Sequence, residues 1–294
     1  HYRDDAPFSS VYLTGLVRDK QGRKMSKSLG NSPDALGLLD QYGADAVRVG
    51  LLLSSAAGND LLFDEALCQQ GKSFANKIWN AYRLIKSFEV SEQIAQPDYA
   101  IDGMRWFESV FASALEQIED HYDKYRISDV LMTIYRLIWD DFCSWLLETI
   151  KPVYGQPIDV KTYNEVTDIL ERLLVVLHPF MPFITEELWQ NIRPRSTGES
   201  ICIAVMPAAN SYNAELLGSF EQTKELVSSI RTIRKDKGIA FKESLDLLVT
   251  TDIDFDLVAT VAAKLSNTSL PKRVDAAPGA SISFRVNKTE FFVP

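Results

Sequence analysis

One short polar segment near the start of the chain carries the side chains best suited to chemistry. Two lysines and two serines lie within five positions, as Lys24, Met25, Ser26, Lys27 and Ser28. A lysine ammonium group is a compact positive charge with three donors, and serine hydroxyls add further donors, so this combination suits phosphate oxygens. Glycines on both sides allow the backbone to approach an anion closely. These residue types indicate a mobile phosphate-binding loop.

The segments around this loop are predicted from local patterns. Residues 10–16 are rich in β-branched and aromatic side chains and predict a short strand, whereas the polar residues 17–33 predict a long loop. Pro33 and Asp34 begin a short helix over residues 35–42, and Gly43 ends it. A second helix is expected over residues 45–53, followed by a turn at 57–60. A loop that leads into a helix N-terminus is favourable for anions.

The alternative interpretation is a solvated surface loop without function. Charge content alone favours that alternative, because most charged segments are simply solvated. The pentapeptide of residues 24–28 is improbable by chance in a chain of 294 residues. It therefore favours the phosphate-binding loop over the solvated surface loop.

Residues 23–31 read RKMSKSLGN and resemble the second signature motif of class I aminoacyl-tRNA synthetases. In that family this loop closes over ATP and stabilises the charge on the departing pyrophosphate. The resemblance implies that Lys24 and Lys27 are catalytic, with Lys27 contacting the phosphates in the transition state. It also implies that residues 24–28 bind ATP, which carries Mg²⁺ in the full-length enzyme.

The composition sets limits on other functions. The chain has 31 Lys and Arg against 40 Asp and Glu, with a net charge of -9, so nucleic-acid binding would need a local basic patch. The three cysteines form no CxxC pair or Cys/His cluster in the sequence, so no disulfide framework and no metal site is expected. His178, beside Pro179, is interpreted as a capping or core histidine. The cysteine usage fits a reducing cytosol, and no apolar run is long enough to span a membrane.

Beyond residue 65 the apolar spacing is that of long amphipathic helices. Stripes that step by three and four run over residues 67–85, 104–118, 127–149, 166–177 and 185–192. One more helix is expected over 214–236, followed by strands at 245–249, 282–286 and 291–293 and a helix at 256–265. The spacing predicts a mainly α chain with an antiparallel helix bundle (66–210) and a small α+β module (211–294). The resemblance implies that the bundle binds the anticodon and that residues 1–65 are the tail of a Rossmann-type α/β catalytic domain.

The resemblance extends over nearly the whole chain. Residues 42–48 (YGADAVR) and 177–189 (LHPFMPFITEELW) resemble segments shared by the class I synthetases for branched aliphatic amino acids. Three further stretches resemble the bacterial valyl-tRNA synthetase family in particular: 58–65 (GNDLLFDE), 76–83 (NKIWNAYR) and 139–145 (WDDFCSW). Ala240-Phe241 departs from the proline pair frequent in that family, which puts only a local turn in doubt.

This resemblance implies ATP-dependent activation of valine and its transfer to tRNA(Val), by a cytoplasmic and monomeric enzyme. The chain starts at His1, lacks a HIGH-type signature and an editing domain, and ends where a coiled-coil arm would follow, so it is interpreted as a C-terminal fragment that is inactive alone. The alternatives are an isoleucyl- or leucyl-tRNA synthetase fragment, or a tRNA-binding module without catalysis. The catalytic-loop motif argues against the last alternative, because a pure binder has no use for a pyrophosphate clamp.

Candidate tRNA-binding residues lie on the first two long helices. Asn80 and Arg83 share a polar stripe, and Arg105 with Trp106 is expected to begin the next helix. By resemblance these residues flank the anticodon, where a guanidinium and an aromatic ring can hold unstacked bases. The alternatives are a solvated face and, for Trp106, core packing beside Phe107.

A second candidate surface is basic. Six cations lie on and after the expected helix at 214–236, and they could meet the tRNA backbone or form a solvated helix face: Lys224, Arg231, Arg234, Lys235, Lys237 and Lys242.

Overall fold

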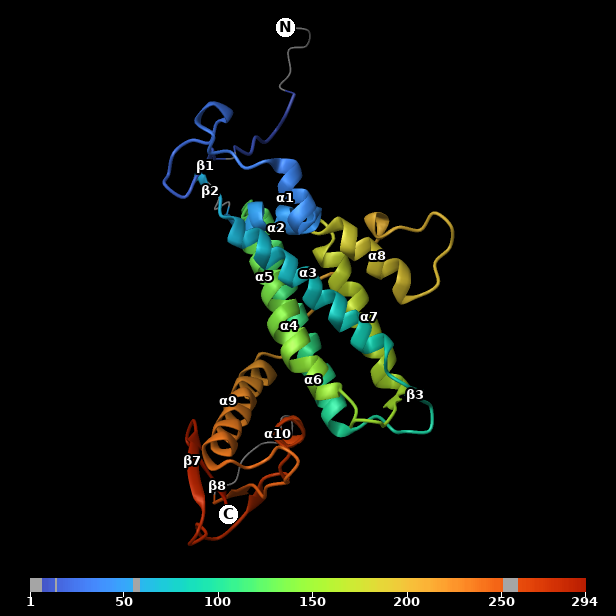
Figure 1. Cartoon of the computed structure of the whole chain (residues 1–294). Helices are drawn as coiled ribbons and strands as arrows, with labels where there is room; N and C mark the ends of the chain where they lie inside the picture. Colours follow the sequence, from blue (N-terminus) through green and yellow to red (C-terminus); the bar gives the residue numbers. More distant parts are fainter. Residues whose placement is uncertain (1–6, 14, 55–58, 251–258) are drawn as a thin grey trace. The chain divides into compact units, whose positions relative to one another are not determined.

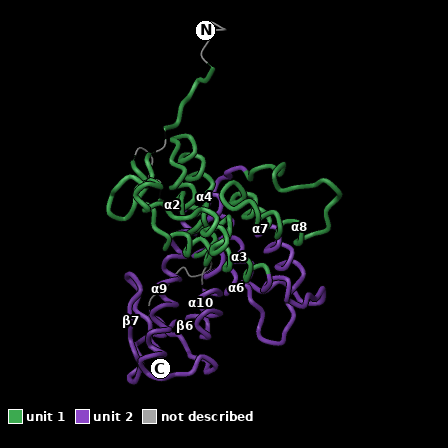
Figure 2. The backbone as a smooth tube through the Cα atoms, turned by 45° about the horizontal axis from the view of Figure 1, so that its top comes forward, with its two compact units in different colours: residues 1–82, 114–139, 171–207 green, residues 83–113, 140–170, 208–294 purple. Residues whose placement is uncertain are grey.

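The computed structural model describes residues 7–13, 15–54, 59–250 and 259–294. The chain divides into two compact units, coloured separately in Figure 2. The first comprises residues 1–82, 114–139 and 171–207, and the second comprises 83–113, 140–170 and 208–294. The division into three parts at residues 65 and 210 stays a prediction, since the long helices pass from one unit to the other.

The region of the KMSKS loop, residues 24–28, has little regular structure of its own. Strand β1 (Val17–Arg18) pairs in parallel with β2 (Leu61–Leu62), and a 3-10 turn, η1, covers Lys27–Leu29. Helices α1 (Ala35–Tyr42) and α2 (Ala44–Ser54) follow as predicted, because Asp34 caps α1 and Gly43 ends it with φ of 88°. The turn expected at 57–60 lies partly outside the described residues.

The strand predicted at residues 10–16 is wrong for the residues that the structure describes there. The observed strand starts at Val17 and has two residues, because its partner β2 also has two. A β-branched sequence forms a strand only where another strand satisfies its backbone groups.

The predicted helices follow in order (Figure 1): α3 (Glu65–Lys86), α4 (Asp98–Asp123), α5 (Ile127–Arg136), α6 (Leu147–Ile150), α7 (Val160–Leu177) and α8 (Pro182–Ile192). Their apolar stripes are buried as expected, with Phe74, Ile78 and Ile85 of α3 almost inaccessible to solvent. Gly71 permits a close approach of α2, since a Cβ there would lie 2.6 Å from the carbonyl oxygen of Ala46. The mainly helical fold class is therefore confirmed.

Two details of these helices differ from the prediction. Helix α4 begins at Asp98, so Arg105 and Trp106 lie inside it rather than at its start. Residues Leu137–Leu146 between α5 and α6 form a π-helical segment, η2, within what the periodicity predicts as one α-helix. Such segments add a residue to the turn and redirect the side chains that follow.

The second unit ends in the predicted small α+β module. Helix α9 (Ala214–Lys237) precedes a four-stranded sheet of order β6-β5-β8-β7. The strands are β5 (Leu248–Val249), β6 (Lys272–Arg273), β7 (Ile282–Val286) and β8 (Thr289–Val293), and α10 (Ala259–Ser266) lies between β5 and β6. A separate parallel pair joins β3 (Val90–Ser91) to β4 (Ile158–Asp159). No helix within the described parts of the chain is both long and apolar enough to cross a membrane.

Candidate functional site

The KMSKS loop directly follows a tight hairpin in the first unit, and the turn of this hairpin lies at residues 19–22. The Met25 amide donates to the Val17 carbonyl (3.1 Å), and the Asp19 amide donates to the Arg23 carbonyl (2.9 Å). These bonds close the chain between β1 and Met25, so the loop residues project from a defined base.

Asp19 in the hairpin and Asn31 just after the KMSKS loop hold these two segments together. Asn31 Nδ2 donates to Asp19 Oδ2 (3.0 Å) and to the Lys24 carbonyl (3.3 Å), while its Oδ1 accepts from the Ser26 amide (2.9 Å). Asp19 also accepts from the backbone and the guanidinium of Arg23. The hydrogen bond from Asn31, together with those from Arg23, holds the pKa of Asp19 well below its usual range. The carboxylate therefore remains charged at neutral pH and keeps these hydrogen bonds. Together, the bonds made by Asp19 and Asn31 form the frame of the loop.

Ser26 shapes the loop itself. Its hydroxyl caps η1 by accepting from the Leu29 amide (3.3 Å), and it lies 3.2 Å from the Ser28 hydroxyl. Gly30 closes the turn in the left-handed region, at φ 63°, with its amide donating to the Lys27 carbonyl. A residue with a side chain is strained in that conformation, so glycine suits this position.

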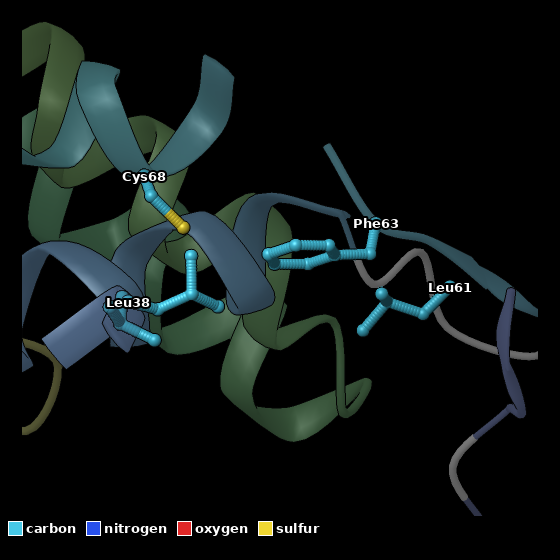
Figure 3. Packing of buried hydrophobic residues seen from close by; sticks show 5 residues of the cluster. Leu38, Leu61, Phe63 and Cys68 are labelled. Atoms are coloured by element: carbon cyan, nitrogen blue, oxygen red, sulfur yellow. The ribbon is translucent and has the colours of Figure 1, made fainter. Parts of the chain in front are cut away.

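Met25 attaches the loop to the hydrophobic core of the first unit. Its side chain is half-buried and packs against a cluster of Leu38, Val47, Leu61, Phe63 and Cys68. Figure 3 shows this cluster, with side chains from α1, α2, α3 and the β2 segment pointing toward one another. The apolar residue of the pentapeptide thus anchors the loop, and its polar neighbours are left for a ligand.

Two ion pairs fasten the base of the hairpin to the β2 segment. Arg18 pairs with Asp60, and Lys20 Nζ lies 2.8 Å from Asp64 Oδ1. The hydrogen bond with Asp64 raises the pKa of Lys20, and the partner lysine lowers the pKa of Asp64. These four residues were not singled out from the sequence, because their pairing depends on contacts more than forty positions apart.

Lys24 and Lys27 are exposed, and neither ammonium group makes a hydrogen bond or ion pair with the described residues. Beside them a pocket of about 500 Å³ is lined by residues 30–33 of the loop end together with Asp19, Lys20, Met25, Phe63 and Glu65. The arrangement can present two positive charges to an anion from a braced hairpin. Residues 24–28 form one continuous loop, and their binding of ATP stays a prediction.

The four predicted tRNA-binding residues fall into two groups. Asn80 and Arg83 on α3 and Arg105 on α4 are exposed. Trp106 is 1% exposed and stacks on Phe220, with ring centroids 3.7 Å apart and an interplanar angle of 11°. The assignment of Trp106 to base stacking is therefore wrong, because its ring already has a partner in the core.

One of the predicted basic residues, Lys224, packs against the aromatic rings around Trp106. Lys224 lies over the rings of Trp106 and Trp145 (5.5 and 5.7 Å to the centroids) and 3.4 Å from Asp141. Burial raises the pKa of Asp141, and the neighbouring lysine opposes that shift. Lys224 is thus half-buried and paired with Asp141 and Glu221, and it does not lie free on the surface.

Arg234 does not belong to the predicted basic surface, because its side chain is buried. It donates to four backbone carbonyls, those of Ala240, Glu243, Ser266 and Asn267. The exposed cations that remain are Arg231, Lys235, Lys237 and Lys242.

Comparisons with known proteins identify the family of this chain. Residues 1–64 match the family model for tRNA synthetases class I (I, L, M and V), and residues 104–249 match the anticodon-binding domain of tRNA ligase. The chain has the fold of a LeuRS from Agrobacterium radiobacter, solved in a ternary complex with tRNA and LeuAMS. That match has a TM-score of 0.50 and 22% identity and covers 72% of this chain and 25% of that one.

Relatives with a curated name are more similar in sequence. The valine–tRNA ligases of Christiangramia forsetii and Phocaeicola vulgatus are each 52% identical over the whole chain, which covers 34% and 33% of their lengths. That of Chlorobaculum tepidum is 36% identical over 80% of the chain, which covers 28% of its length. The chain spans about a third of the length of the curated relatives it matches, and it belongs to the valine–tRNA ligase family within the class I aminoacyl-tRNA synthetases.

Proposed function

We propose that this chain supplies the pyrophosphate-facing loop and an anticodon-binding surface to an enzyme that activates valine with ATP and transfers it to tRNA(Val). The observation that carries the proposal is the exposure of Lys24 and Lys27, which make no ion pair with any described residue. They lie on a loop that hydrogen bonds and core packing attach to the first unit. The names of the relatives support valine as the amino acid.

The proposed chemical role follows from where charge develops. When the valine carboxylate attacks the α-phosphorus of ATP, the bond to pyrophosphate breaks and negative charge grows on the leaving group. Donors already aimed at that charge stabilise the transition state more than the ground state. Lys27 is the principal donor in this proposal and Lys24 assists it. Mg²⁺ accompanies ATP as part of the substrate.

The loop has features that suit closure over a substrate. Its attachment is concentrated at the base, through Met25, Asp19 and Asn31, whereas Lys27, Ser28 and Leu29 at its tip are exposed. A braced base with an exposed tip permits small movements that bring the lysines to the phosphates. Asp19, the acidic residue near this loop, already accepts hydrogen bonds from Asn31, Arg23 and the Gln21 amide.

The proposed tRNA surface consists of Asn80, Arg83 and Arg105, which are exposed on α3 and α4. Guanidinium planes can stack on unstacked loop bases and donate to their edges. No hydrogen bond or ion pair among the described residues links Arg105 to the other two. The enzyme is further proposed to be a cytoplasmic monomer.

The proposal is tested with Lys27→Ala in the full-length enzyme. We expect the rate of valyl-adenylate formation to fall by about 10²–10³, the loss typical of one transition-state donor, with little change in valine binding. Single-turnover activation kinetics measure both quantities. Lys151→Ala removes an exposed lysine elsewhere and is the matched control. An unchanged activation rate with a raised KM for valine would show that Lys27 has another role.

A further inference from the structure

Three metal-ligating side chains that are far apart in the sequence meet in the first unit. His178 follows α7, Glu186 lies on α8, and Cys202 lies on the 3-10 turn η3 (Ile201–Ile203). One ligand atom from each of them lies within 4.8 Å of the other two. Among the described residues this is the one group of three or more His, Cys, Asp and Glu side chains with such spacing.

Hydrogen bonds fix which nitrogen of His178 carries the proton. The Thr185 hydroxyl donates to the Met181 carbonyl (2.7 Å), so its oxygen accepts from His178 Nδ1, also at 2.7 Å. With its proton on Nδ1, the neutral ring has a lone pair on Nε2, and that atom lies 3.2 Å from Cys202 Sγ. An imidazole held this way, with its other nitrogen donating to a fixed oxygen, is the usual arrangement of a metal-bound histidine.

Glu186 is oriented by its own partners. Oε1 accepts from Gln190 Nε2 (2.7 Å), and Oε2 accepts from the Ser200 hydroxyl (2.7 Å) and the Ile201 amide (3.2 Å). A carboxylate has about four acceptor positions, so these three donors leave one position for a cation. Cys202 is exposed, and this gives an ion a path from solvent.

We propose that His178 Nε2, Glu186 and Cys202 Sγ form a Zn²⁺ site, with water in the fourth position. On binding, the Cys202 thiol releases its proton to solvent and the thiolate coordinates the ion. Zinc–ligand distances of about 2.0–2.3 Å place tetrahedral ligand atoms about 3.3–3.8 Å apart. The Nε2–Sγ distance of 3.2 Å is already close to that range, and one ligand atom of each of the three residues lies within 4.8 Å of the other two.

The chemistry of the three ligands selects among metal ions. Thiolate and imidazole suit Zn²⁺ and other late first-row ions, whereas Mg²⁺ prefers an octahedron of oxygen ligands. The site is thus distinct from any binding of the Mg²⁺ that accompanies ATP. Its ligands belong to neither the KMSKS loop nor the proposed tRNA surface, so this inference does not depend on the proposed function.

The test is a titration of the complete 294-residue chain with Zn²⁺ in competition with a chromophoric chelator, under a reductant that does not bind metal. We expect one equivalent of Zn²⁺ to bind, and excess Mg²⁺ not to displace it. Cys202→Ser and Glu186→Gln should each weaken binding at least about tenfold, since even residues that only support a ligand contribute 10–100-fold. Glu187→Gln, an exposed carboxylate on the same helix, is the matched control.

Co²⁺ substitution provides a second readout that does not depend on affinity. Bound Co²⁺ should give a thiolate charge-transfer absorption that disappears in Cys202→Ser, although Cys68 and Cys143 remain. The inference is overturned if Cys202→Ser retains the affinity for Zn²⁺, if Glu187→Gln loses as much as Glu186→Gln, or if the Co²⁺ form lacks the thiolate band.

Discussion

Trp106 and Arg105 are neighbours in the sequence with opposite environments. The indole is buried against Phe220, with Trp145 edge-on to the same ring, whereas the guanidinium is exposed. On a helix, adjacent residues point about 100° apart, so one can face the core and the other solvent. Of these two residues, only Arg105 is therefore still proposed to bind tRNA.

Replacing Trp106 should change stability. Trp106→Ala removes a stacked core ring and leaves a cavity, which should lower the free energy of unfolding by about 3–5 kcal/mol. Chemical denaturation of the chain measures this, with Trp79→Ala, a partly exposed tryptophan, as the control expected to lose less. A loss for Trp106→Ala no larger than that for Trp79→Ala would contradict the packing role.

Arg83 and Lys235 allow two kinds of RNA contact to be separated, because both are exposed cations. We expect Arg83→Ala to reduce the discrimination between a valine anticodon stem-loop and a single-base variant, at about 1–3 kcal/mol for a lost stacking partner. Lys235→Ala should weaken binding to both RNAs alike and reduce the salt dependence. Fluorescence anisotropy across a salt series gives both quantities. If Arg83→Ala leaves the ratio of the two affinities unchanged, its face of α3 is merely solvated.

At the scale of the element, the KMSKS hairpin is held by a frame of side-chain hydrogen bonds rather than by a long strand pair. Asp19 receives donors from Asn31, Arg23 and the Gln21 amide, and this lowers its pKa relative to the unfolded chain. For a carboxyl group with a lowered folded pKa, the stabilisation is complete above its ordinary pKa of about 3.9. It is lost as the pH falls through the lower folded value. The frame should therefore be intact at neutral pH.

Asp19→Asn tests this frame. The amide cannot accept all the bonds that the carboxylate accepts, so residues 17–31 should exchange their amide hydrogens faster while the rest of the chain is unaffected. Hydrogen exchange followed by mass spectrometry measures the difference, and Asp40→Asn on the exposed side of α1 is the control. Equal exchange in Asp19→Asn and the unmodified chain would mean that the packing of Met25 alone holds the hairpin.

At the scale of the whole molecule, the proposed catalytic lysines are only one part of the groups that an activation site needs. A charge contributes to rate only when the reacting groups are positioned against it. The chain spans about a third of its relatives and contains no HIGH-type motif. We therefore expect no valine-dependent ATP–pyrophosphate exchange above background from the 294-residue chain, with a full-length relative as positive control. Exchange by the chain itself would show that it contains a complete activation site.

The sequence by itself determined the local features. The KMSKS residues, the cap at Asp34, the stop at Gly43 and the helical stripes of α3 to α9 all depend on neighbours within one or two turns. The same holds for the strands β7 and β8, which are joined by a tight turn at Asn287. Local propensity and spacing are readable from the chain, because the interacting residues are close along it.

Only the tertiary structure decided which side chains are available to a ligand. Arg234 and Trp106 have types that suit nucleic acid, yet core partners distant in sequence bury both. Conversely, His178, Glu186 and Cys202 carry no motif spacing, and the packing of α8 and η3 beside the end of α7 places them together. Whether a side chain can contact a ligand depends on long-range packing, because packing decides which groups stay exposed to solvent. Residue type and local spacing do not contain that information.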